Sequence, residues 1–431
     1  MSEIEVIEEI LLKKLEGKFV NVDDNEKLRL IRTATKEFYP NIDDKDIKKI
    51  FEDLNTLDPI SKLVDDTNIE DIMINNTRNI FVYDSKLGYK KMDFRIESTD
   101  ELEKFVAKLK LYKTNEDAKS NIIDVHMPNG SRANLITSPR GYDITIRNFK
   151  QVPYSIIDLI NMGELTYKVA ARLWLYVDGF KVRPANILIG GMPGAGKTTL
   201  LNAMFSFFRP EQRIITMEET YELNTEIHEN CINLETSEDL TLEDLVKNCL
   251  RMRPDTMVVG EVRGSEANDM LTAMNIGKIV MGTIHASTTR DIVNRLTHSP
   301  MDVPIDIVPI IDALIIISQV YKNNKPIRRI TQISEISGIE SGKVLLSDLY
   351  KFDFKTDQAS AMAPSITYRD ILSNMLGIPP QYILREEEIR AAILERLNKL
   401  GKTTISQINE VVRQYYKDPK QTLIDLGLIN E

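Results

Sequence analysis

Cysteine is almost absent from this 431-residue chain, which has only Cys231 and Cys249. Two cysteines cannot build a disulfide scaffold or a four-cysteine zinc module, and they are consistent with a reducing cytoplasm. Long apolar runs are also missing, because Pro309 and Asp312 interrupt the most apolar window, residues 308–320. We therefore expect a cytoplasmic protein that does not span a membrane, although it can work beside one. The acidic N-terminus lacks the basic start and apolar centre of a secretory signal.

Positive charge is in deficit, because 55 lysines and arginines face 65 aspartates and glutamates, giving a net charge of −10. Proteins that coat nucleic acid depend on excess positive charge, so we expect no nucleic-acid partner, although a local basic patch stays open. Hydrophobic residues make up 42% of the chain and charged residues 28%, enough to bury cores and stay soluble. The length corresponds to two or three domains of about 150 residues.

The hydrophobic pattern changes along the chain. The first 55 residues have helical spacing, and short apolar runs separated by turn residues then indicate a small α+β domain. Between residues 185 and 318, aliphatic runs alternate with helical stretches, which is typical of a largely parallel sheet covered on both faces. The predicted fold class is therefore α/β with a smaller N-terminal domain. The predicted regions are a helical N-terminal segment (1–55), an α+β domain (56–150), a linker (151–165), the α/β domain (166–345) and a helical C-terminal region (346–431).

A glycine-rich loop lies between the apolar run 186–189 and a helical stretch, and it fits the P-loop pattern G-x-x-x-x-G-K-[ST]. In such a loop the glycines let backbone N–H groups face phosphate oxygens, and the helix N-terminus adds the positive end of its dipole. Lys197 would place a cation on the β- and γ-phosphates, and Thr198 would offer its hydroxyl to Mg²⁺. The alternative, an inert glycine-rich turn, is disfavoured by the strand and helix beside it. The residues expected to bind the nucleotide are Gly191, Met192, Pro193, Gly194, Ala195, Gly196, Lys197, Thr198 and Thr199.

Carboxylates follow two other predicted strands. Glu261 ends one apolar run, as a Walker B acid does, where it can hold Mg²⁺ or polarise the attacking water. Glu218, Glu219 and Glu222 come directly after the run 213–217, and three acids at one strand end are costly unless a cation or water uses them. We predict that Glu222 orients or deprotonates the lytic water. The alternatives are a surface glutamate at 261 and a solvated acidic turn at 218–222.

A histidine and three arginines complete the set of candidates. His285 follows the run 278–283, where an imidazole can donate a hydrogen bond to the γ-phosphate, although a structural histidine is the alternative. Phosphoryl transfer also spreads charge over the γ-phosphate oxygens, and a guanidinium can stabilise it. Arg132, Arg140 and Arg147 are predicted to cluster in the smaller domain. For each of them a surface salt bridge is the alternative.

Taken together, these motifs resemble the secretion ATPases of type II and type IV systems. The resemblance rests on the Walker A loop, the acidic box 218–222, the run 250–264 with Gly-Glu-Val-Arg-Gly, and the box 281–286 around the histidine, in the family's order and spacing. It covers roughly residues 56–345, and four coupled motifs make it specific.

The resemblance implies a hexameric ring whose subunits each have an N-terminal domain and a RecA-like P-loop ATPase domain, joined by a flexible linker, with ATP bound between them. Hydrolysis would drive a polytopic membrane platform protein from the inner face of the membrane. The implied cofactors are ATP and Mg²⁺. The family roles fall on Lys197 for the phosphates, Thr198 and Glu261 for magnesium, Glu222 as general base and His285 as γ-phosphate sensor.

Further details of the resemblance concern the arginines and the lineage. Arg132 and Arg147 match arginines that reach the nucleotide from the N-terminal domain, and Arg140 is expected to join them. The chain cannot form the four-cysteine zinc element usual in type II members, and the stretch 295–304 looks more like the archaeal branch, which powers type IV pili and the archaellum. One departure is Glu219, which stands where the family usually has aspartate.

The function expected from the resemblance is ATP hydrolysis that powers a type IV pilus-like or archaellum filament, or secretion. The alternative is a RecA-like nucleic-acid motor, such as a helicase or a DNA-transfer ATPase, because the same sheet and P-loop serve both classes. A basic pore or an aromatic stacking platform would indicate that class, and the sequence has no basic run with interleaved aromatics. A third possibility is a scaffold that binds ATP and turns over slowly, which the full set of acids and arginines argues against.

Overall fold

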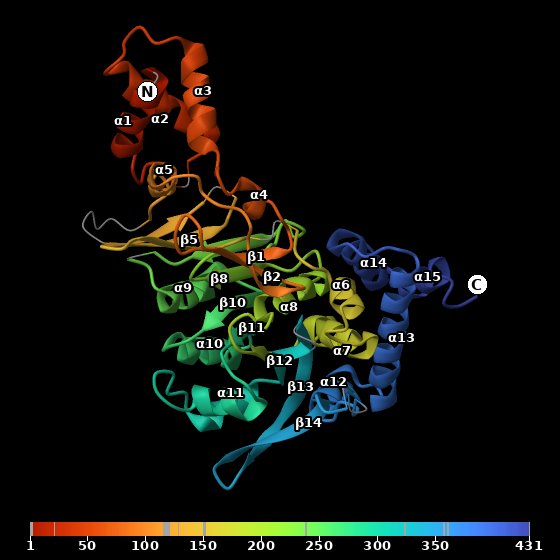
Figure 1. Cartoon of the computed structure of the whole chain (residues 1–431). Helices are drawn as coiled ribbons and strands as arrows, with labels where there is room; N and C mark the ends of the chain where they lie inside the picture. Colours follow the sequence, from red (N-terminus) through yellow and green to blue (C-terminus); the bar gives the residue numbers. More distant parts are fainter. Residues whose placement is uncertain are drawn as a thin grey trace. The chain divides into compact units, whose positions relative to one another are not determined.

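The chain divides into two compact units in the computed structural model, Met1–Gln151 with Tyr321–Pro326, and Val152–Val320 with Ile327–Glu431 (Figure 1). Within the described residues, no helix combines the length and apolar character that a membrane crossing requires. The structure describes residues 3–20, 22–114, 121–127, 129–149, 152–237, 239–322, 325–356, 358–359 and 362–430.

The first unit combines helices with an antiparallel sheet. Asp23 and Asp43 start α2 and α3, because their side chains accept hydrogen bonds from the backbone N–H groups of Glu26 and Lys45. The helices are α1 (Glu3–Lys14), α2 (Asp24–Lys36), α3 (Asp44–Asn55), α4 (Ser61–Val64) and α5 (Thr99–Lys110). In the order β3-β2-β1-β6-β5-β4, the strands are β1 (Ile69–Ile74), β2 (Ile80–Asp84), β3 (Gly88–Lys91), β4 (Ile122–His126), β5 (Arg132–Ser138) and β6 (Gly141–Arg147).

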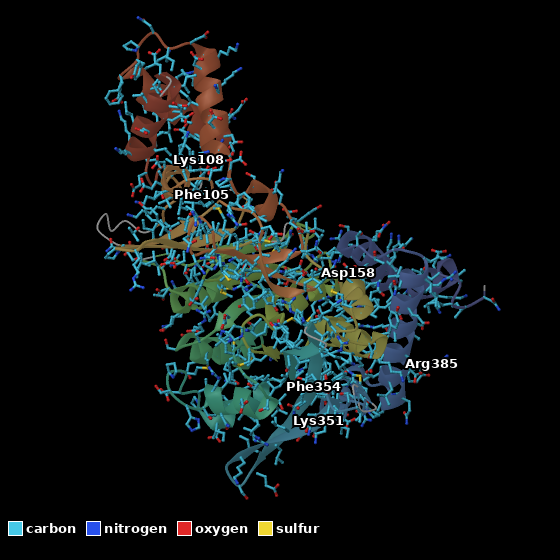
Figure 2. All side chains as sticks on the ribbon, in the orientation of Figure 1. Phe105, Lys108, Asp158, Lys351, Phe354 and Arg385 are labelled. Atoms are coloured by element: carbon cyan, nitrogen blue, oxygen red, sulfur yellow. The ribbon has the colours of Figure 1, made fainter. Side chains whose placement is uncertain are left out.

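Helices and sheet of the first unit share one hydrophobic core. Leu11 of α1 is buried in the same cluster as Ile72 of β1 and Phe105 of α5. Figure 2 labels Phe105 and Lys108 on α5, where burial lowers the pKa of the Lys108 amine. The helices within residues 1–55 are therefore part of the core that also buries the sheet, rather than a separate cap.

The segment expected to be a linker with a short helix from Ser155 contains that helix, α6 (Ile156–Asn161). Ser155 starts it with a capping box, in which Ser155 and Asp158 each bond the other's backbone N–H. Ile157 of this helix is buried in the core of the second unit. Residues 150 and 151, at the start of the predicted linker, lie outside the described residues.

The second unit is built on a nine-stranded sheet. Its order is β15-β14-β13-β12-β7-β11-β10-β8-β9, and neighbouring strands from β12 to β9 run parallel, while β13, β14 and β15 pair antiparallel. The strands are β7 (Ile187–Gly190), β8 (Ile214–Glu218), β9 (Cys231–Glu235), β10 (Thr256–Val262), β11 (Ile279–Ile284), β12 (Ala313–Lys322), β13 (Lys325–Glu340), β14 (Lys343–Asp353) and β15 (Gln358–Ala359).

Side chains alternate between two cores along the parallel strands. Ile187 and Ile189 of β7 face one hydrophobic cluster, whereas Leu188 between them faces the other. On β12, Ile315 and Ile316 divide in the same way. Since successive strand residues point to opposite faces, both faces of this sheet are covered, as the aliphatic runs predicted.

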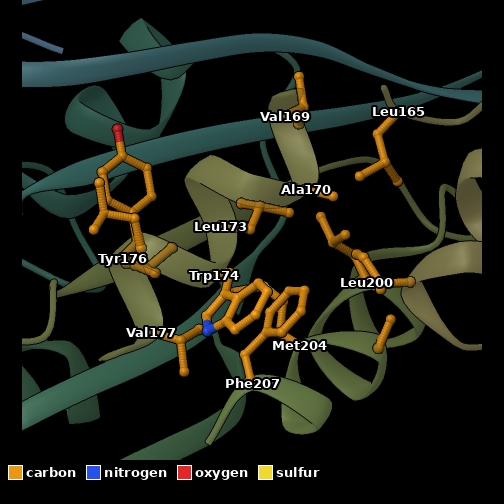
Figure 3. Close-up of a cluster of buried hydrophobic side chains, with 14 of the residues drawn as sticks. Leu165, Val169, Ala170, Leu173, Trp174, Tyr176, Val177, Leu200, Met204 and Phe207 are labelled. Carbon is orange, nitrogen blue, oxygen red and sulfur yellow. The ribbon is translucent and has the colours of Figure 1, made fainter. Parts of the chain in front are cut away.

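Helices cover the two faces separately. The face of Leu188 packs on α9 (Leu242–Cys249), α10 (Glu266–Asn275) and α11 (Thr289–Leu296). On the other face, Trp174 of α7 stacks on Phe207 with ring centroids 5.4 Å apart (Figure 3). This second face is covered by α7 (Tyr167–Asp178), α8 (Lys197–Met204), α12 (Thr367–Leu376), α13 (Pro380–Lys399) and α14 (Ile405–Lys417). The helix α15 (Pro419–Asp425) follows α14. Short 3₁₀ turns are η1 (Gly179–Lys181), η2 (Phe205–Phe207), η3 (Leu250–Met252) and η4 (Ile305–Ile310).

The C-terminal region expected to be helical from residue 346 begins differently. Residue 346 lies inside β14, which pairs with β13 and extends the sheet to Asp353. Helices resume at Thr367. The run 343–353 is rich in aliphatic and aromatic residues but does not alternate regularly between apolar and polar ones, so its local pattern does not separate a strand from a helix, and the pairing with β13 decides the outcome.

Candidate functional site

The glycine-rich loop forms the expected turn between β7 and α8. Gly194 and Gly196 have φ angles of +74° and +98°, the left-handed region that side chains with a Cβ disfavour. A Cβ on Gly191 would lie 2.7 Å from the backbone carbonyl oxygen of Ile317, so the loop also runs too close to β12 for any larger residue there. Lys197 is the first residue of α8, and the helix N-terminus therefore faces the loop.

His285 joins the P-loop lysine to the Walker B acid. The Lys197 amine lies 3.2 Å from Nδ1 of His285, and Nε2 of the same ring contacts Oε1 of Glu261. Nδ1 also lies 3.3 Å from the carbonyl oxygen of Gly191, so the ring can accept from Lys197 in one tautomer or donate to Gly191 in the other, and Oε1 of Glu261 accepts no hydrogen bond from any described residue. Lys197 is buried, and His285 and Glu261 are about three-quarters buried, with exposed side-chain fractions of 26% and 21%.

Glu261 lies where β10 departs from regular pairing. The register between β10 and β11 shifts between Val259 and Val262, and the carbonyl oxygen of Gly260 accepts a hydrogen bond from Thr283 (2.5 Å) rather than continuing the ladder. Burial raises the pKa of the Glu261 carboxyl. The hydrogen bond and charge of Arg263, with the positive charge of Lys197, lower that pKa by more than burial raises it, so the net shift is downward. Glu261 is therefore ionised at neutral pH.

The acidic box packs against this strand end. Glu218 is buried, and its carboxylate accepts hydrogen bonds from the backbone N–H groups of Glu222 (3.1 Å) and Leu223 (3.2 Å). A Cβ on Gly260 would lie 2.9 Å from Cγ of Glu218, so the glycine before the Walker B acid makes room for the box. The first acid of the box thus shapes the loop.

The loop after β8 is also attached to the P-loop helix. Asn202 of α8 donates from Nδ2 to the carbonyl oxygen of Glu222 (3.0 Å) and accepts from the backbone N–H of Asn224 (2.8 Å). These two bonds fix the backbone on both sides of Leu223 relative to α8. Glu222, the predicted general base, is half-buried in this fixed loop and near enough to Arg263 to raise the pKa of that guanidinium together with Glu261 and Glu219.

The three arginines of the first unit do not cluster as expected. Arg132 and Arg147 are direct partners in the antiparallel register of β5 and β6. Arg140 lies in the turn at the far end of this hairpin, between Ser138 and Gly141, about 20 Å away at the usual strand rise. Arg132 and Arg147 therefore lie side by side, and Arg140 lies apart from both.

Two residues at the site were not found from the sequence. Arg328 of β13 donates from Nε to the carbonyl oxygen of Gly194 in the P-loop (3.0 Å), and Glu266 accepts hydrogen bonds from the backbone N–H groups of Arg263 (2.5 Å) and Gly264 (2.8 Å). Arg328 is 134 residues from Gly194, and no local pattern marks such a contact. Glu266 follows Gly264-Ser265 at the start of a helix, and an acid in a first turn is a signal that could have found it.

The donors present are of the type that Mg²⁺ prefers. Magnesium binds few protein oxygens and keeps waters and phosphate oxygens, so a hydroxyl and a carboxylate suffice on the protein side. Thr198 follows Lys197 at the start of α8, and the contacts of Lys197 and Glu261 with His285 bring this helix end and the Walker B acid together. Within the described ranges, no cluster of three or more His, Cys, Asp or Glu side chains forms a metal site by itself. The donor set fits a metal carried by the nucleotide.

Comparison with known proteins identifies the family. The chain matches the family model described as Type II/IV secretion system protein over residues 53–320. It is 30% identical over 380 residues to the uncharacterized protein MJ0900 of Methanocaldococcus jannaschii, covering 84% of this chain and 68% of that protein. It is 26% identical over 285 residues to the type IV secretion system protein VirB11 of Bartonella henselae, covering 57% of this chain and 80% of that protein.

A solved structure similar to this chain is the Legionella pneumophila ATPase DotB, at 17% identity and a TM-score of 0.47, covering 81% of this chain and 92% of that one. The family model matches more than half of the present chain, and its match includes all four motifs around Lys197, Glu218, Glu261 and His285. The chain therefore belongs to the type II/IV secretion system ATPase family.

Proposed function

We propose that this protein hydrolyses ATP in the presence of Mg²⁺ and uses the energy for mechanical work. The observation that supports the proposal is one continuous series of contacts, from Lys197 through His285 and Glu261 to Arg263 and Glu219. These residues come from four sequence motifs. They lie at the ends of the parallel strands β8, β10 and β11 and at the start of α8, which follows β7. The P-loop lysine and the acid at the end of the neighbouring strand are parts that phosphoryl transfer requires, and this series of contacts brings them to one place.

Each side chain then has a role that its position permits. Lys197 binds the phosphates, and Thr198 and Glu261 hold the magnesium ion, which when bound neutralises charge on the β- and γ-phosphate oxygens. Glu222, on the loop fixed by Asn202, orients the attacking water and accepts its proton. His285 donates a ring N–H to the γ-phosphate and thereby senses it.

Arg132 and Arg147 are proposed to add positive charge near the nucleotide phosphates. Their like charges stand opposite each other on β5 and β6, and a phosphate would relieve the repulsion. Arg140 is the weakest of the three candidates, because it occupies the opposite end of the hairpin. A guanidinium that contacts the transferring phosphoryl group contributes only in the transition state, so its loss should lower kcat more than nucleotide affinity.

The mechanical role follows from the family. We propose a homohexamer, peripheral to the inner face of the cell membrane, that acts on a polytopic membrane protein and drives either filament assembly or secretion. Similarity to VirB11 of a type IV secretion system supports the secretion arm. Similarity to an uncharacterized protein of Methanocaldococcus jannaschii agrees with an archaeal lineage, and the filament arm, with a type IV pilus or archaellum as the product, rests on the resemblance of the motifs alone.

The test of hydrolysis is phosphate release by the purified full-length protein with ATP and Mg²⁺, compared among three variants. Lys197→Ala should lose nucleotide affinity, while Glu261→Gln should bind nucleotide and turn over about 10²-fold more slowly, as expected when one charge stabiliser is removed. Lys168→Ala removes an exposed lysine of α7 and serves as the control. If Lys197→Ala and Glu261→Gln both keep the parental rate and affinity, this site is not the ATPase site.

The mechanical partner is tested by co-purification with a polytopic membrane protein of the same gene cluster, with the ATPase rate measured before and after. Association that depends on nucleotide, and a rate that rises on association, would support the motor. Stimulation of the rate by single-stranded DNA, lost at high salt, would point instead to a nucleic-acid motor. Absence of both effects, together with a single-subunit mass in solution with ATP, would contradict the hexameric motor.

A further inference from the structure

The Glu261 carboxylate lies against two side chains of the chain itself, but only its Oε2 accepts a hydrogen bond from them. Nε2 of His285 contacts Oε1, and Nη2 of Arg263 donates to Oε2 at 2.9 Å. A cation at Glu261 would therefore meet two groups that already use its negative charge. One of them is a permanently charged guanidinium, which lowers the attraction of this carboxylate for a metal ion.

Arg263 has a second carboxylate within the same fork. Its Nη1 donates to Oε2 of Glu219 at 2.7 Å, while Nη2 holds Glu261. Residues 261 and 263 are two positions apart on an extended segment, so their side chains leave on the same side. Glu219 comes from the loop after β8, and the guanidinium therefore bridges two elements that the sequence separates by 44 residues.

The side chain of Arg263 is freer to move than its backbone. The backbone N–H groups of Arg263 and Gly264 both donate to Oε1 of Glu266, whose side chain is buried at the start of α10. By contrast, the side chains of Arg263 and Glu219 are 54% and 49% exposed, against 21% for Glu261. The more exposed end of the bridge is thus the pair with Glu219.

We propose that Arg263 is a positioning residue that occupies Glu261 in the absence of nucleotide and is retained by Glu219 when Glu261 turns to the metal. The proposal rests on the proposed ATPase function, since the metal arrives with the nucleotide. The ion pair with Glu219 then keeps the Arg263 guanidinium away from the metal.

The exchange predicts that removing Arg263 and removing Glu219 have opposite effects on metal affinity. Without the guanidinium, nothing competes for Oε2 of Glu261, so the metal should bind more tightly. Without the Glu219 carboxylate, Arg263 keeps only Glu261, so the metal should bind more weakly. When Arg263 is already absent, loss of Glu219 should matter little, because its effect passes through the guanidinium.

The experiment measures Mn²⁺ binding by EPR on the full-length protein saturated with a non-hydrolysable ATP analogue. Arg263→Gln should lower the dissociation constant for Mn²⁺ about two- to fivefold, the range of a half-exposed ion pair, and Arg263→Lys should fall between it and the parent. Glu219→Gln should raise that constant by a similar factor. Arg295→Gln removes an exposed arginine of α11 and controls for net charge.

The double variant decides between exchange and simple charge. Glu219→Gln introduced into Arg263→Gln should leave Mn²⁺ binding unchanged if the proposal is right. An equal effect of Glu219→Gln in both backgrounds, or Mn²⁺ binding that Arg263→Gln weakens or leaves unchanged, would overturn it. A parent that binds the analogue with Mn²⁺ while the variants fail these expectations sinks only the exchange, whereas a parent that binds no analogue sinks the ATPase proposal as well.

Discussion

At the scale of single residues, a second histidine behaves differently from the one at the site. His228, in the loop before β9, is buried, and its Nε2 lies 2.8 Å from the carbonyl oxygen of Phe205. Burial lowers the pKa of this imidazole, the hydrogen bond to Phe205 acts against the shift, and the charge of Arg413 adds to it. The folded protein therefore keeps His228 neutral at a pH where the unfolded chain takes up a proton.

The consequence is a loss of stability in mild acid. Because the unfolded state binds more protons below the ordinary histidine pKa of about 6.5, the free energy of unfolding falls as the pH drops from 7 through that value. His228→Gln should make this fall shallower while costing stability at pH 7.5. Urea unfolding of both proteins at pH 5.5 and 7.5 measures the difference, and an identical pH dependence would contradict the assignment.

A hydrogen bond from β13 helps to hold the P-loop backbone. Arg328 donates to the carbonyl oxygen of Gly194, and its Cδ lies 3.3 Å from where a Cβ on Gly196 would be. Arg328→Gln should weaken nucleotide binding by several-fold, since a charge-assisted bond contributes about 1.5–3 kcal/mol at most and this side chain is half-exposed. Titration with a fluorescent ATP analogue gives the affinity.

The neighbouring residue provides the control for that measurement. Arg329 donates to the carbonyl oxygens of Met162 and Arg328, and both lie outside the phosphate loop. Arg329→Gln should therefore leave nucleotide affinity near the parental value. Equal losses in both variants would mean that β13 affects the loop through general stability instead of through the hydrogen bond to Gly194.

At the scale of elements, α7 and α13 are joined by a buried ion network. Nη1 and Nη2 of Arg390 donate to the two oxygens of Asp178 at 2.8 and 3.0 Å, and Nε donates to Glu386 at 2.9 Å. The Arg390 guanidinium also lies 5.0 Å from the centroid of the Trp174 ring. The side chains of Arg390 and Asp178 are each 2% exposed. Removing one charge therefore leaves the other buried, with neither an ion-pair partner nor solvent to stabilise it.

Breaking this network should cost far more than breaking a surface pair on the same helix. Arg390→Met is expected to lower the free energy of unfolding by about 3–5 kcal/mol, because it leaves Asp178 buried and unpaired. Lys399, at the C-terminal end of α13, forms an exposed ion pair with Glu395. Lys399→Met should lower the free energy of unfolding by less than about 0.5 kcal/mol. Urea unfolding followed by circular dichroism measures both, and similar costs for the two variants would contradict the ion-network argument.

Local elements were predictable from the sequence where local pattern decides them. The P-loop and the strand ends with Glu218, Glu261 and His285 follow from short-range rules about glycine, apolar runs and parallel sheets. What could not be predicted depends on contacts between distant segments. Arg328 reaches the P-loop only because β13 continues the sheet beyond β12. Arg132 and Arg147 are neighbours only because of the register of β5 and β6, and the same register places Arg140 at the other end of the hairpin.

At the scale of the whole molecule, each of the two units has its own core. Ile72 belongs to the cluster of the first unit, and Leu271 of α10 belongs to a cluster of the second, both with no exposed surface. Large-to-small changes at such sites cost about 2–5 kcal/mol. The cost should be confined to the unit that contains the change, since the clusters have no member in common.

Hydrogen exchange on the full-length protein tests this independence. Ile72→Ala should speed exchange in peptides of the first unit and leave α10 and β10 protected, and Leu271→Ala should do the reverse. Mass spectrometry of peptides gives both patterns in one experiment. Faster exchange across the entire chain in either variant would show that the two units unfold together, and the description of separate cores would then fail as an account of stability.

The only tryptophan of the chain gives this protein a built-in optical probe. Trp174 has no exposed surface, stacks on Phe207, meets the edges of Tyr415 and Tyr416, and donates from Nε1 to the hydroxyl of Tyr416 (2.8 Å). Its emission therefore arises from one place, where α7 meets α14. A shift of that emission to longer wavelength would report detachment of α14 from the core of the second unit, without any label or added chromophore.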